Sequence, residues 1–347
     1  MMNPEYIRFL AFSEKDRLDL FLGTATRLGT SVQNVEKDFW VCWTLDALFN
    51  GLPPGGPRLL FKGGTSLSKG HGLISRFSED IDITVFREDL HQSVTVEQLE
   101  NLGTKARGRK LDAIREACSA FIMGPLRDEL EGLFREMAPS ATLRVEPDPE
   151  DREHQSLLLW YPRVSEMGDG YVGPAVKIEA GAKSALDPHH PLTIRPYLAE
   201  DLKAFNLDVP NVTTVAPART LWDKVVILHG LRRWFEEKGE LKGEGQRVSR
   251  HYYDLHQLLN STVADDALND QALGRDCVGH ARMFFNRAAY DLNSAKPGSF
   301  ALLPHGRMIN ALRGDYERMS GMIFGELPDF DQVLESISAL EKRVNQS

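Results

Sequence analysis

Residues 58–83 read RLLFKGGTSLSKGHGLISRFSEDIDI, and the predicted fold depends on this stretch. A short apolar run leads into Gly63-Gly64, and a short helical segment follows at about 65–69. A second run, at about 80–86, begins with alternating acidic and apolar residues. Glycines after a strand permit a tight turn, and alternation with a period of two is typical of a half-buried strand. The stretch therefore predicts two strands connected through a glycine turn and a short helix.

The rest of the chain adds helices and a few more strands to this beginning. Three or four strands with helices between them indicate a small mixed sheet. We therefore expect an α/β (α+β) fold, with flanking helices around the sheet and a mainly helical C-terminal lobe. Helical patterns cover 35–49, 104–137 and most of 217–347 with a break at 239–246, and strands at 155–161 and 175–180 enclose a glycine-rich turn at 168–173.

Changes in these patterns suggest where the chain divides. Helices at 1–50 are expected to pack on a core at 51–215, which carries both parts of the opening stretch. A helical lobe is expected at 216–347. A chain of 347 residues is long enough to bury a sizeable core in each of two lobes.

Composition and charge narrow the class of protein. With 42% hydrophobic and 26% charged residues, the chain is neither disordered nor fibrous. Its formal net charge of −9 excludes a protein that coats long nucleic acid, so any RNA contact should be a local patch. The three cysteines are far apart and lack metal-binding spacing, which favours a reducing compartment. With no leader-like start and no stretch of membrane-spanning length, we expect a cytoplasmic protein without a membrane partner.

Asp80 and Asp82 are the strongest candidates for metal ligands. Residues two apart on a strand point to the same face, so these carboxylates project together, while Glu79 points to the opposite face. Adjacent carboxylates repel each other unless a cation lies between them, and Mg²⁺ prefers such oxygen ligands. Glu179 could supply a third carboxylate from a neighbouring strand, because it interrupts an apolar run. The alternatives are a solvated strand edge for the two aspartates and a Lys or Arg partner for Glu179.

The turn formed by Lys62, Gly63, Gly64, Thr65 and Ser66 is a candidate phosphate site. Backbone N–H groups of a glycine turn can approach phosphate closely, and the start of a helix adds positive potential. The simpler alternative is a turn followed by a helix-capping hydroxyl. Together with the aspartates, the turn favours a two-metal reaction of a nucleoside triphosphate (NTP). One Mg²⁺ would hold the triphosphate, and a second would activate an acceptor hydroxyl for in-line attack at the α-phosphorus.

With these motifs identified, the chain resembles the AbiEii/AbiGii nucleotidyltransferase toxins, relatives of the MenT toxins within the DNA polymerase β-like nucleotidyltransferase superfamily. The likeness extends over residues 35–340. The motifs that carry it are KGGTSLSK at 62–69, RFSEDIDI at 76–83, PARTLWDK at 217–224 and RHYYDL at 250–255, with further likeness in EKDFWV at 36–41 and at 312–324.

The resemblance implies a role for each matching residue. Gly64 and Thr65 would meet the nucleotide phosphates, with Ser66 as an alternative hydroxyl, and the two aspartates would bind Mg²⁺. Lys224 would neutralise triphosphate charge, and Asp254 would be the acidic residue of the fourth motif. The resemblance also implies a toxin of a toxin–antitoxin or phage-defence pair, with a cognate antitoxin encoded nearby. The expected acceptor is the 3′ end of tRNA, and the active site is expected in the cleft between the lobes.

The C-terminal lobe offers a second interpretation for several of these residues. A Lys on a helix face, such as Lys224, is usually only solvated, and Asp254 could simply stabilise a helix N-terminus. Between 219 and 250 there are eight Lys/Arg and five Asp/Glu, interleaved with Trp234 and Phe235 and followed by two tyrosines. Such a segment could hold a single-stranded RNA end through phosphate contacts and base stacking, or it could be a charged loop between helices.

The acceptor is the least determined part of this interpretation. The same site could modify a protein side chain or a small molecule, and a non-catalytic nucleotide-binding module is the alternative from another class.

Overall fold

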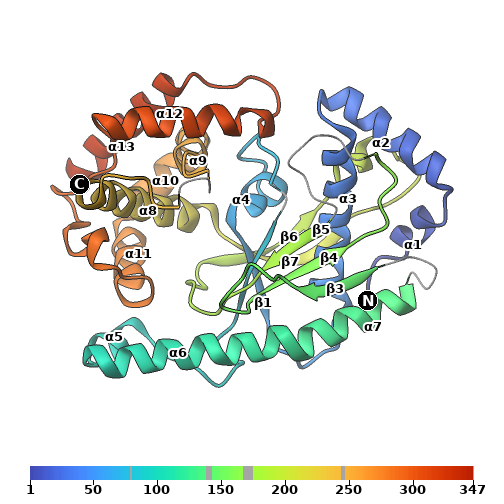
Figure 1. Ribbon diagram of the computed structural model, residues 1–347, viewed down its shortest axis with the longest axis horizontal. Coiled ribbons are helices and arrows are strands. Elements are labelled where there is room, and N and C mark those ends of the chain that lie inside the picture. Colours follow the sequence, from blue (N-terminus) through green and yellow to red (C-terminus); the bar gives the residue numbers. More distant parts are fainter. Residues whose placement is uncertain (79, 138–142, 167–174, 244–246, 347) are drawn as a thin grey trace. The chain divides into compact units, whose positions relative to one another are not determined.

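The computed structural model describes residues 1–78, 80–137, 143–166, 175–243 and 247–346. By its internal contacts the chain forms two compact units (Figure 1). The first contains Met1–His71, Phe77–Val94 and Gly103–Val215, and the second contains Gly72–Arg76, Thr95–Leu102 and Ala216–Ser347. Two short segments of the N-terminal half thus belong to the unit that contains the C-terminal helices.

The first unit is built on a mixed seven-stranded sheet, which confirms the predicted fold class. The strand order is β3-β4-β5-β2-β1-β7-β6. The central strands β1 and β2 are antiparallel, whereas β7 runs parallel to β1 and β5 runs parallel to β2. The strands are β1 (Leu59–Lys62), β2 (Ile81–Val85), β3 (Arg144–Pro147), β4 (Ser156–Trp160), β5 (Ala175–Glu179), β6 (His189–Ile194) and β7 (Val209–Val215).

The prediction of three or four strands was too low, and the missed strands have features that hide them in the sequence. Edge strand β6 contains Pro191, and β7 contains Pro210 followed by Asn211 at a positive φ of 60°. Proline cannot donate a ladder hydrogen bond, so it lowers the strand signal. β3, at the other edge, is only four residues long and mostly exposed.

A buried helix, α3 (Val32–Asp46), packs against strands β5 and β7 and contributes to the core of the first unit. Ser31 caps it by accepting a hydrogen bond from the Asn34 N–H, as expected for a helix N-cap. Its aromatic residues Phe39, Trp40 and Trp43 are at most 1% exposed. The other helices of this region are α1 (Pro4–Leu10), α2 (Glu14–Leu28) and the π-turn η1 (Ala47–Gly51).

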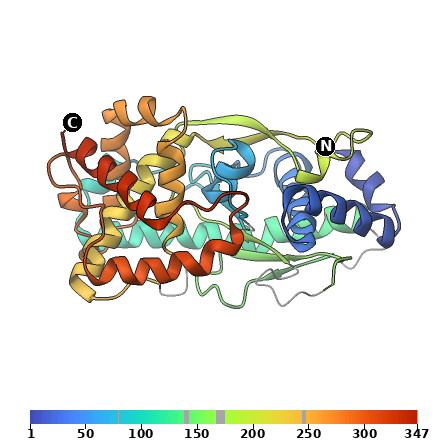
Figure 2. The same ribbon diagram turned by 90° about the horizontal axis from the view of Figure 1, so that it is seen from above.

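The helical prediction for 104–137 is confirmed by α6 (Thr104–Phe121), η3 (Ile122–Leu126) and α7 (Arg127–Met137). Figures 1 and 2 show the three as one long rod. Pro125 is accommodated in the π-turn η3, where the regular helix hydrogen-bond pattern is interrupted. Short helical elements complete the unit: α4 (Gly63–Thr65), η2 (Ser66–Gly70) and η4 (Tyr197–Glu200).

The second unit is mainly helical, as predicted. Its longest helix, α8 (Pro217–Lys238), begins with proline at a position that tolerates the missing N–H. The others are α5 (Val96–Glu100), α9 (Arg250–Leu259), α10 (Ala264–Asn269), α11 (Gln271–Phe284), α12 (Arg307–Met319) and α13 (Phe330–Gln346), with 3₁₀ turns η5 (Ala288–Tyr290), η6 (Leu292–Ser294) and η7 (Ser320–Met322).

Two expectations fall wholly or partly outside the described residues: the glycine-rich turn at 168–173 and the second half of the break at 239–246. Within the described ranges, every helix is too short or too polar to traverse a lipid bilayer.

Candidate active site

Gly63 packs directly against Asp82, and this approach connects the two sequence motifs. Gly63 follows β1 with a φ of 78°, in the left-handed region that favours glycine. A Cβ atom at Gly63 would lie 2.0 Å from Asp82 Oδ2, which is far inside van der Waals contact. Only glycine therefore lets the turn and this carboxylate occupy their observed positions.

The buried hydroxyls of Thr65 and Ser66 stabilise the turn through hydrogen bonds. The Thr65 hydroxyl donates to the carbonyl oxygen of Asp80 (2.5 Å) and is hydrogen-bonded to the Ser78 hydroxyl (2.7 Å). Ser66 Oγ donates to the Gly63 carbonyl oxygen at 2.8 Å. Both side chains are fully buried. Their observed role is to fix the turn to the start of β2, and the predicted contact of either hydroxyl with phosphate stays a prediction.

Lys62, Asp82 and Glu179 form a row across three neighbouring strands. Asp82 is the register partner of Lys62 on β1 and of Glu179 on β5. Directly opposed residues project from the same face of a sheet, so the three side chains share one face. Lys62 Nζ lies 3.8 Å from Asp82 Oδ1, and the Asp82 side chain is 27% exposed. Asp80 lies just before β2 and is partly buried.

Glu179 combines features of both interpretations that the sequence left open. It lies beside Asp82 on a neighbouring strand, as a third metal ligand would. Glu179 also forms an ion pair with Lys177, in which Lys177 Nζ lies 2.8 Å from Glu179 Oε1. The Glu179 side chain is 43% exposed. A role as a metal ligand stays a prediction.

The carboxylates at the start of β2 fit a magnesium ion in chemistry. Mg²⁺ takes oxygen ligands and commonly uses one or two protein carboxylates, with the other positions filled by water and substrate phosphates. Among the described residues, no group of three or more His, Cys, Asp or Glu side chains is arranged to hold a metal ion. Asp80 and Asp82 would therefore be the main protein ligands, and Glu79 lies outside the described residues.

A buried ion pair behind the turn was missed from the sequence. Lys69, in η2, lies 2.7 Å from Asp38 of α3, and the two side chains are 5% and 3% exposed. Asp38 also accepts a hydrogen bond from the Tyr197 N–H (2.6 Å), and the Lys69 ammonium lies 3.6 Å from the Tyr197 ring centroid. Burial alone would lower the pKa of Lys69, but Asp38 raises it above its usual value. The available signal was a run of three charged residues, Glu36, Lys37 and Asp38, directly before the apolar stretch that begins at Phe39.

In the second unit, Lys224 and Asp254 lie together, joined by a third residue that the sequence did not single out. Lys224 was expected among the polar residues of its helix face, but its side chain is only 7% exposed. Its Nζ lies 2.8 Å from Asp254 Oδ2. Arg76 donates to both oxygens of the same carboxylate, at 2.7 and 2.9 Å. The RFSEDIDI motif contains Arg76, but nothing in the sequence pointed to a partner that lies 178 residues away.

The electrostatics of this cluster keep Asp254 ionised. Burial would raise the pKa of Asp254, but Arg76 and Lys224 together hold it well below its usual range. Burial lowers the pKa of Lys224, and Asp254 opposes that effect. His251, whose Nδ1 lies 3.4 Å from Lys224 Nζ, has its pKa lowered well below its usual value by burial and by the neighbouring cations. His251 is therefore neutral at physiological pH.

The predicted stacking of RNA bases on the two tyrosines was wrong. Tyr252 and Tyr253 are 0% exposed and belong to the core of the helical unit. Several basic residues of the same segment are also engaged in ion pairs: Arg219 with Asp223 and Asp276, Lys224 with Asp254, and Arg232 and Arg233 with Glu236. Burial could not be foreseen because Tyr-Tyr in a helix suits either a core or a stacking surface.

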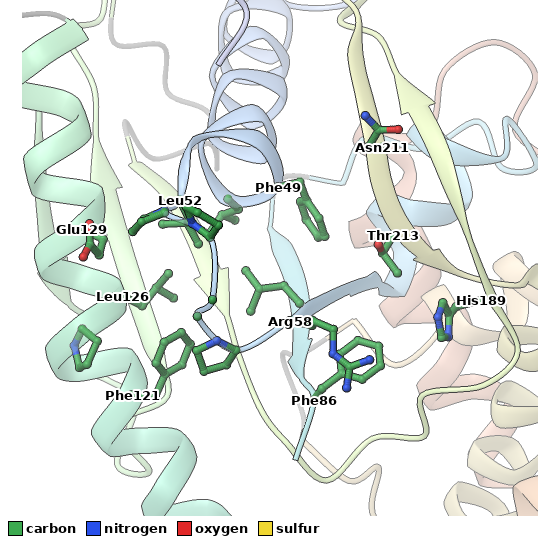
Figure 3. Close-up of a pocket in the computed structure, with 18 residues that line it drawn as sticks. Phe49, Leu52, Arg58, Phe86, Phe121, Leu126, Glu129, His189, Asn211 and Thr213 are labelled. Carbon is green, nitrogen blue, oxygen red and sulfur yellow. The ribbon is translucent and has the colours of Figure 1, made fainter. Parts of the chain in front are cut away.

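The first unit also contains a pocket of about 770 Å³, which Figure 3 shows. Its apolar lining includes Phe49, Phe86 and the proline-rich loop 52–57. Arg58 on its rim is already paired with Asp89 at 2.8 Å. The pocket adjoins the Leu59 end of β1, whereas Gly63 follows the other end of that strand. It includes none of the motif residues and is not the candidate active site.

Comparisons with known proteins give one assignment. A family model described as the nucleotidyl transferase AbiEii toxin of a type IV toxin–antitoxin system matches residues 46–336. No curated protein matches the sequence significantly. Among solved structures, the fold is similar to MenT4, a nucleotidyltransferase toxin from Mycobacterium tuberculosis, with 16% identity, a TM-score of 0.49, and coverage of 94% of this chain and 88% of that one. It is also similar to JHP933 from Helicobacter pylori, with 12% identity, a TM-score of 0.42, and coverage of 91% and 94%.

Proposed function

The chain belongs to the AbiEii family of nucleotidyltransferase toxins, and from this membership we propose that it transfers a nucleoside monophosphate from an NTP to an acceptor hydroxyl in a magnesium-dependent reaction. The proposed acceptor is the 3′ end of tRNA. The proposed setting is the cytoplasm, where a cognate antitoxin encoded nearby opposes the toxin and the pair acts in phage defence.

The observation that carries the proposal is the contact between Gly63 and Asp82. A glycine turn that leaves no room for a Cβ beside a carboxylate is suited to bring backbone N–H groups and a metal-binding oxygen to the same phosphate. Bound Mg²⁺ would supply charge neutralisation of the triphosphate and activation of the acceptor hydroxyl. Asp80 and Asp82 would hold it, and Glu179 is the proposed third carboxylate.

Lys224 is proposed to neutralise charge on the triphosphate. A lysine ammonium is a compact point charge that suits phosphate oxygens. The cluster of Lys224, Arg76 and Asp254 carries two positive charges and one negative charge in a buried setting. Because the Asp254 carboxylate is shared between Lys224 and Arg76, a phosphate oxygen is a suitable further partner for the Lys224 ammonium.

The choice of tRNA rests on charge as well as on family resemblance. The net charge of −9 disfavours binding along an extended RNA strand, and a 3′ end requires only a few contacts. Among the aromatic residues first considered for base stacking, Trp234 and Phe235 keep partial exposure, in contrast to the buried tyrosines.

The test is to incubate the purified protein with Mg²⁺, total tRNA and each of the four labelled NTPs in turn. We expect label at the tRNA 3′ end, and we expect Asp80→Asn and Asp82→Asn each to lower incorporation by about a thousandfold, which corresponds to ~4 kcal/mol of transition-state stabilisation. Asp19→Asn, an exposed position on α2, is the matched control and should leave incorporation unchanged. Unchanged incorporation in both motif variants would overturn the catalytic proposal. Label entering protein instead of RNA would overturn the choice of acceptor.

A further inference from the structure

The carboxylate of Asp254 lies at the centre of a buried cluster whose members come from three segments of the second unit. Arg76 belongs to Gly72–Arg76, Lys224 to α8, and Asp254 to α9. The Asp254 side chain is 0% exposed. We propose that Asp254 is a positioning residue that fixes the ammonium of Lys224, with Arg76 as its permanent counter-ion, and that Asp254 neither binds metal nor transfers a proton. This inference rests on the proposed function, in which Lys224 meets the triphosphate.

Both oxygens of Asp254 are already engaged by cations. Oδ1 accepts a hydrogen bond from Arg76 Nε at 2.7 Å, and Oδ2 accepts from Arg76 Nη2 at 2.9 Å and from Lys224 Nζ at 2.8 Å. The planar arginine fork matches the two oxygens and holds the carboxylate in one orientation. These three donors leave about one of the four lone-pair positions of the carboxylate, on Oδ1, and a divalent cation bound there would lie beside two positive charges. The geometry therefore opposes metal binding at Asp254.

The backbone around Arg76 is fixed within the same unit. Arg76 forms a β-bridge with Ile323, and the Phe324 N–H donates to the Ser75 carbonyl oxygen at 2.7 Å. The β-bridge and this hydrogen bond fix the backbone at Arg76, and the Asp254 carboxylate fixes its guanidinium. These contacts give Arg76 a structural role as an anchor of Asp254.

Lys224 is the member of the cluster that is equipped to meet an anion. Its ammonium has three hydrogens. Asp254 Oδ2 accepts one of them, and His251 Nδ1 lies 3.4 Å from the ammonium, where it accepts a second in the tautomer protonated at Nε2. The third hydrogen of the ammonium is the one that we assign to a phosphate oxygen. Asp254 and His251 together determine the direction of that hydrogen, and in this way Asp254 positions Lys224.

A carboxylate that binds metal would affect the binding of both the metal ion and the nucleotide. A residue that only positions Lys224 should affect the binding of the nucleotide alone. We would measure Mn²⁺ binding by the loss of the free-ion electron paramagnetic resonance signal, and binding of each NTP by calorimetry. The variants are Asp254→Asn, Asp82→Asn as the metal-ligand comparison, and Arg76→Lys, which keeps the charge but loses the fork. For Asp254→Asn and Arg76→Lys we expect NTP affinity to fall at least tenfold while Mn²⁺ affinity stays within twofold of the parent protein. Asp82→Asn should lose Mn²⁺ binding.

Removal of one partner of a buried ion pair can prevent folding, so a variant that keeps the net charge of the three residues is needed. Arg76→Met combined with Asp254→Asn removes one charge of each sign and therefore keeps that net charge. We expect this double variant to fold and to bind Mn²⁺ like the parent protein, yet to bind NTP at least tenfold more weakly. Parent-like NTP affinity in the folded double variant would show that Lys224 needs no positioning and would overturn the inference.

Two further outcomes distinguish this inference from the function on which it rests. If Asp254→Asn loses Mn²⁺ affinity as fully as Asp82→Asn does, Asp254 is a metal ligand and the inference alone fails. If the parent protein binds no NTP in the presence of Mn²⁺, and Asp82→Asn leaves Mn²⁺ binding unchanged, the proposed nucleotidyl-transfer site itself fails and the inference fails with it.

Discussion

At the scale of single residues, position 63 imposes two requirements, and glycine is the one residue that meets both. Its φ of 78° is costly for residues with a side chain, by roughly 1–2 kcal/mol. Its position against Asp82 also leaves no space for a Cβ atom. The first requirement concerns stability only, whereas the second affects the carboxylate that we propose as a metal ligand. A comparison of two glycines can separate the two effects.

We expect Gly63→Ala to lower nucleotide incorporation by about a hundredfold, because a displacement of even 1 Å at a reacting centre can cost that much. Gly29→Ala is the matched control, since Gly29 has a similar φ of 64° but nothing within 4 Å of an added Cβ. Both variants should lose thermal stability because of the positive φ, Gly63→Ala should lose more because Asp82 must also shift, and only Gly63→Ala should lose activity. Equal activity in the two variants would contradict the proposed role of the contact between Gly63 and Asp82.

Elements that depend on nearby sequence could be predicted, and contacts with partners distant in sequence could not. The strand that carries Asp82 was predicted because strand geometry is local, whereas metal binding by Asp80 and Asp82 stays a prediction. Arg76 has its partner 178 residues away, so no local pattern reveals that it anchors Asp254. Thr65 illustrates an intermediate case: its place in the turn was predicted, but not that its hydroxyl would be directed into the protein.

At the scale of elements, α3 supports the Gly63-Gly64 turn through η2. The Lys69–Asp38 pair connects η2 to α3. Glu36, two residues before Asp38, accepts hydrogen bonds from the Val164 N–H at 2.7 Å and from the Ser165 N–H at 3.0 Å. Buried acids on one helix thus hold both the turn and the loop after β4. This arrangement gives a structural reason for charged residues in an otherwise apolar helix.

We expect Lys69→Met to destabilise the protein by about 3–5 kcal/mol, because it leaves Asp38 buried without its cation. The double variant Asp38→Asn with Lys69→Met should be less destabilised than the single variant, since no uncompensated charge remains. Urea unfolding measures both. Arg195→Met, which breaks the exposed pair with Asp208, is the control and should cost less than about 1 kcal/mol. A loss of that small size for Lys69→Met would show that the buried pair does not support the turn.

The elements that could be predicted are those with a strong periodic pattern. The helical stretch at 104–137 and the strand that carries Asp82 have clear polar and apolar periods. Strands β6 and β7 have prolines and exposed polar positions, and their pairing with each other and with β1 stabilises them as strands. That stabilisation comes from neighbours distant in sequence, so propensity alone could not reveal it.

At the scale of the whole molecule, net charge and local charge act in opposite directions on any RNA acceptor. The chain carries −9 overall, and four of the eight basic residues between 219 and 250 are engaged in the ion pairs described above. Arg250 is exposed and lies close enough to Lys224 to lower its pKa. RNA binding should therefore depend on a few cations near this cluster and not on a broad positive surface.

The salt dependence of tRNA binding tests this view. For single-stranded contacts, the slope of log K against log salt is roughly −0.7 per phosphate, so about three contacts give a slope near −2. This slope is far shallower than the slope of about −10 for a protein that binds along a duplex. We would measure tRNA affinity between 50 and 200 mM salt with the Asp82→Asn variant, so that the RNA is not modified during the titration. Arg250→Ala in this background should make the slope shallower by about one contact, whereas Arg275→Ala, an exposed position on α11, should not change it. A steep slope, or an equal reduction of the slope by both variants, would contradict an acceptor held only at its end, because either result requires dispersed phosphate contacts. An unchanged slope with Arg250→Ala would contradict a phosphate contact at Arg250.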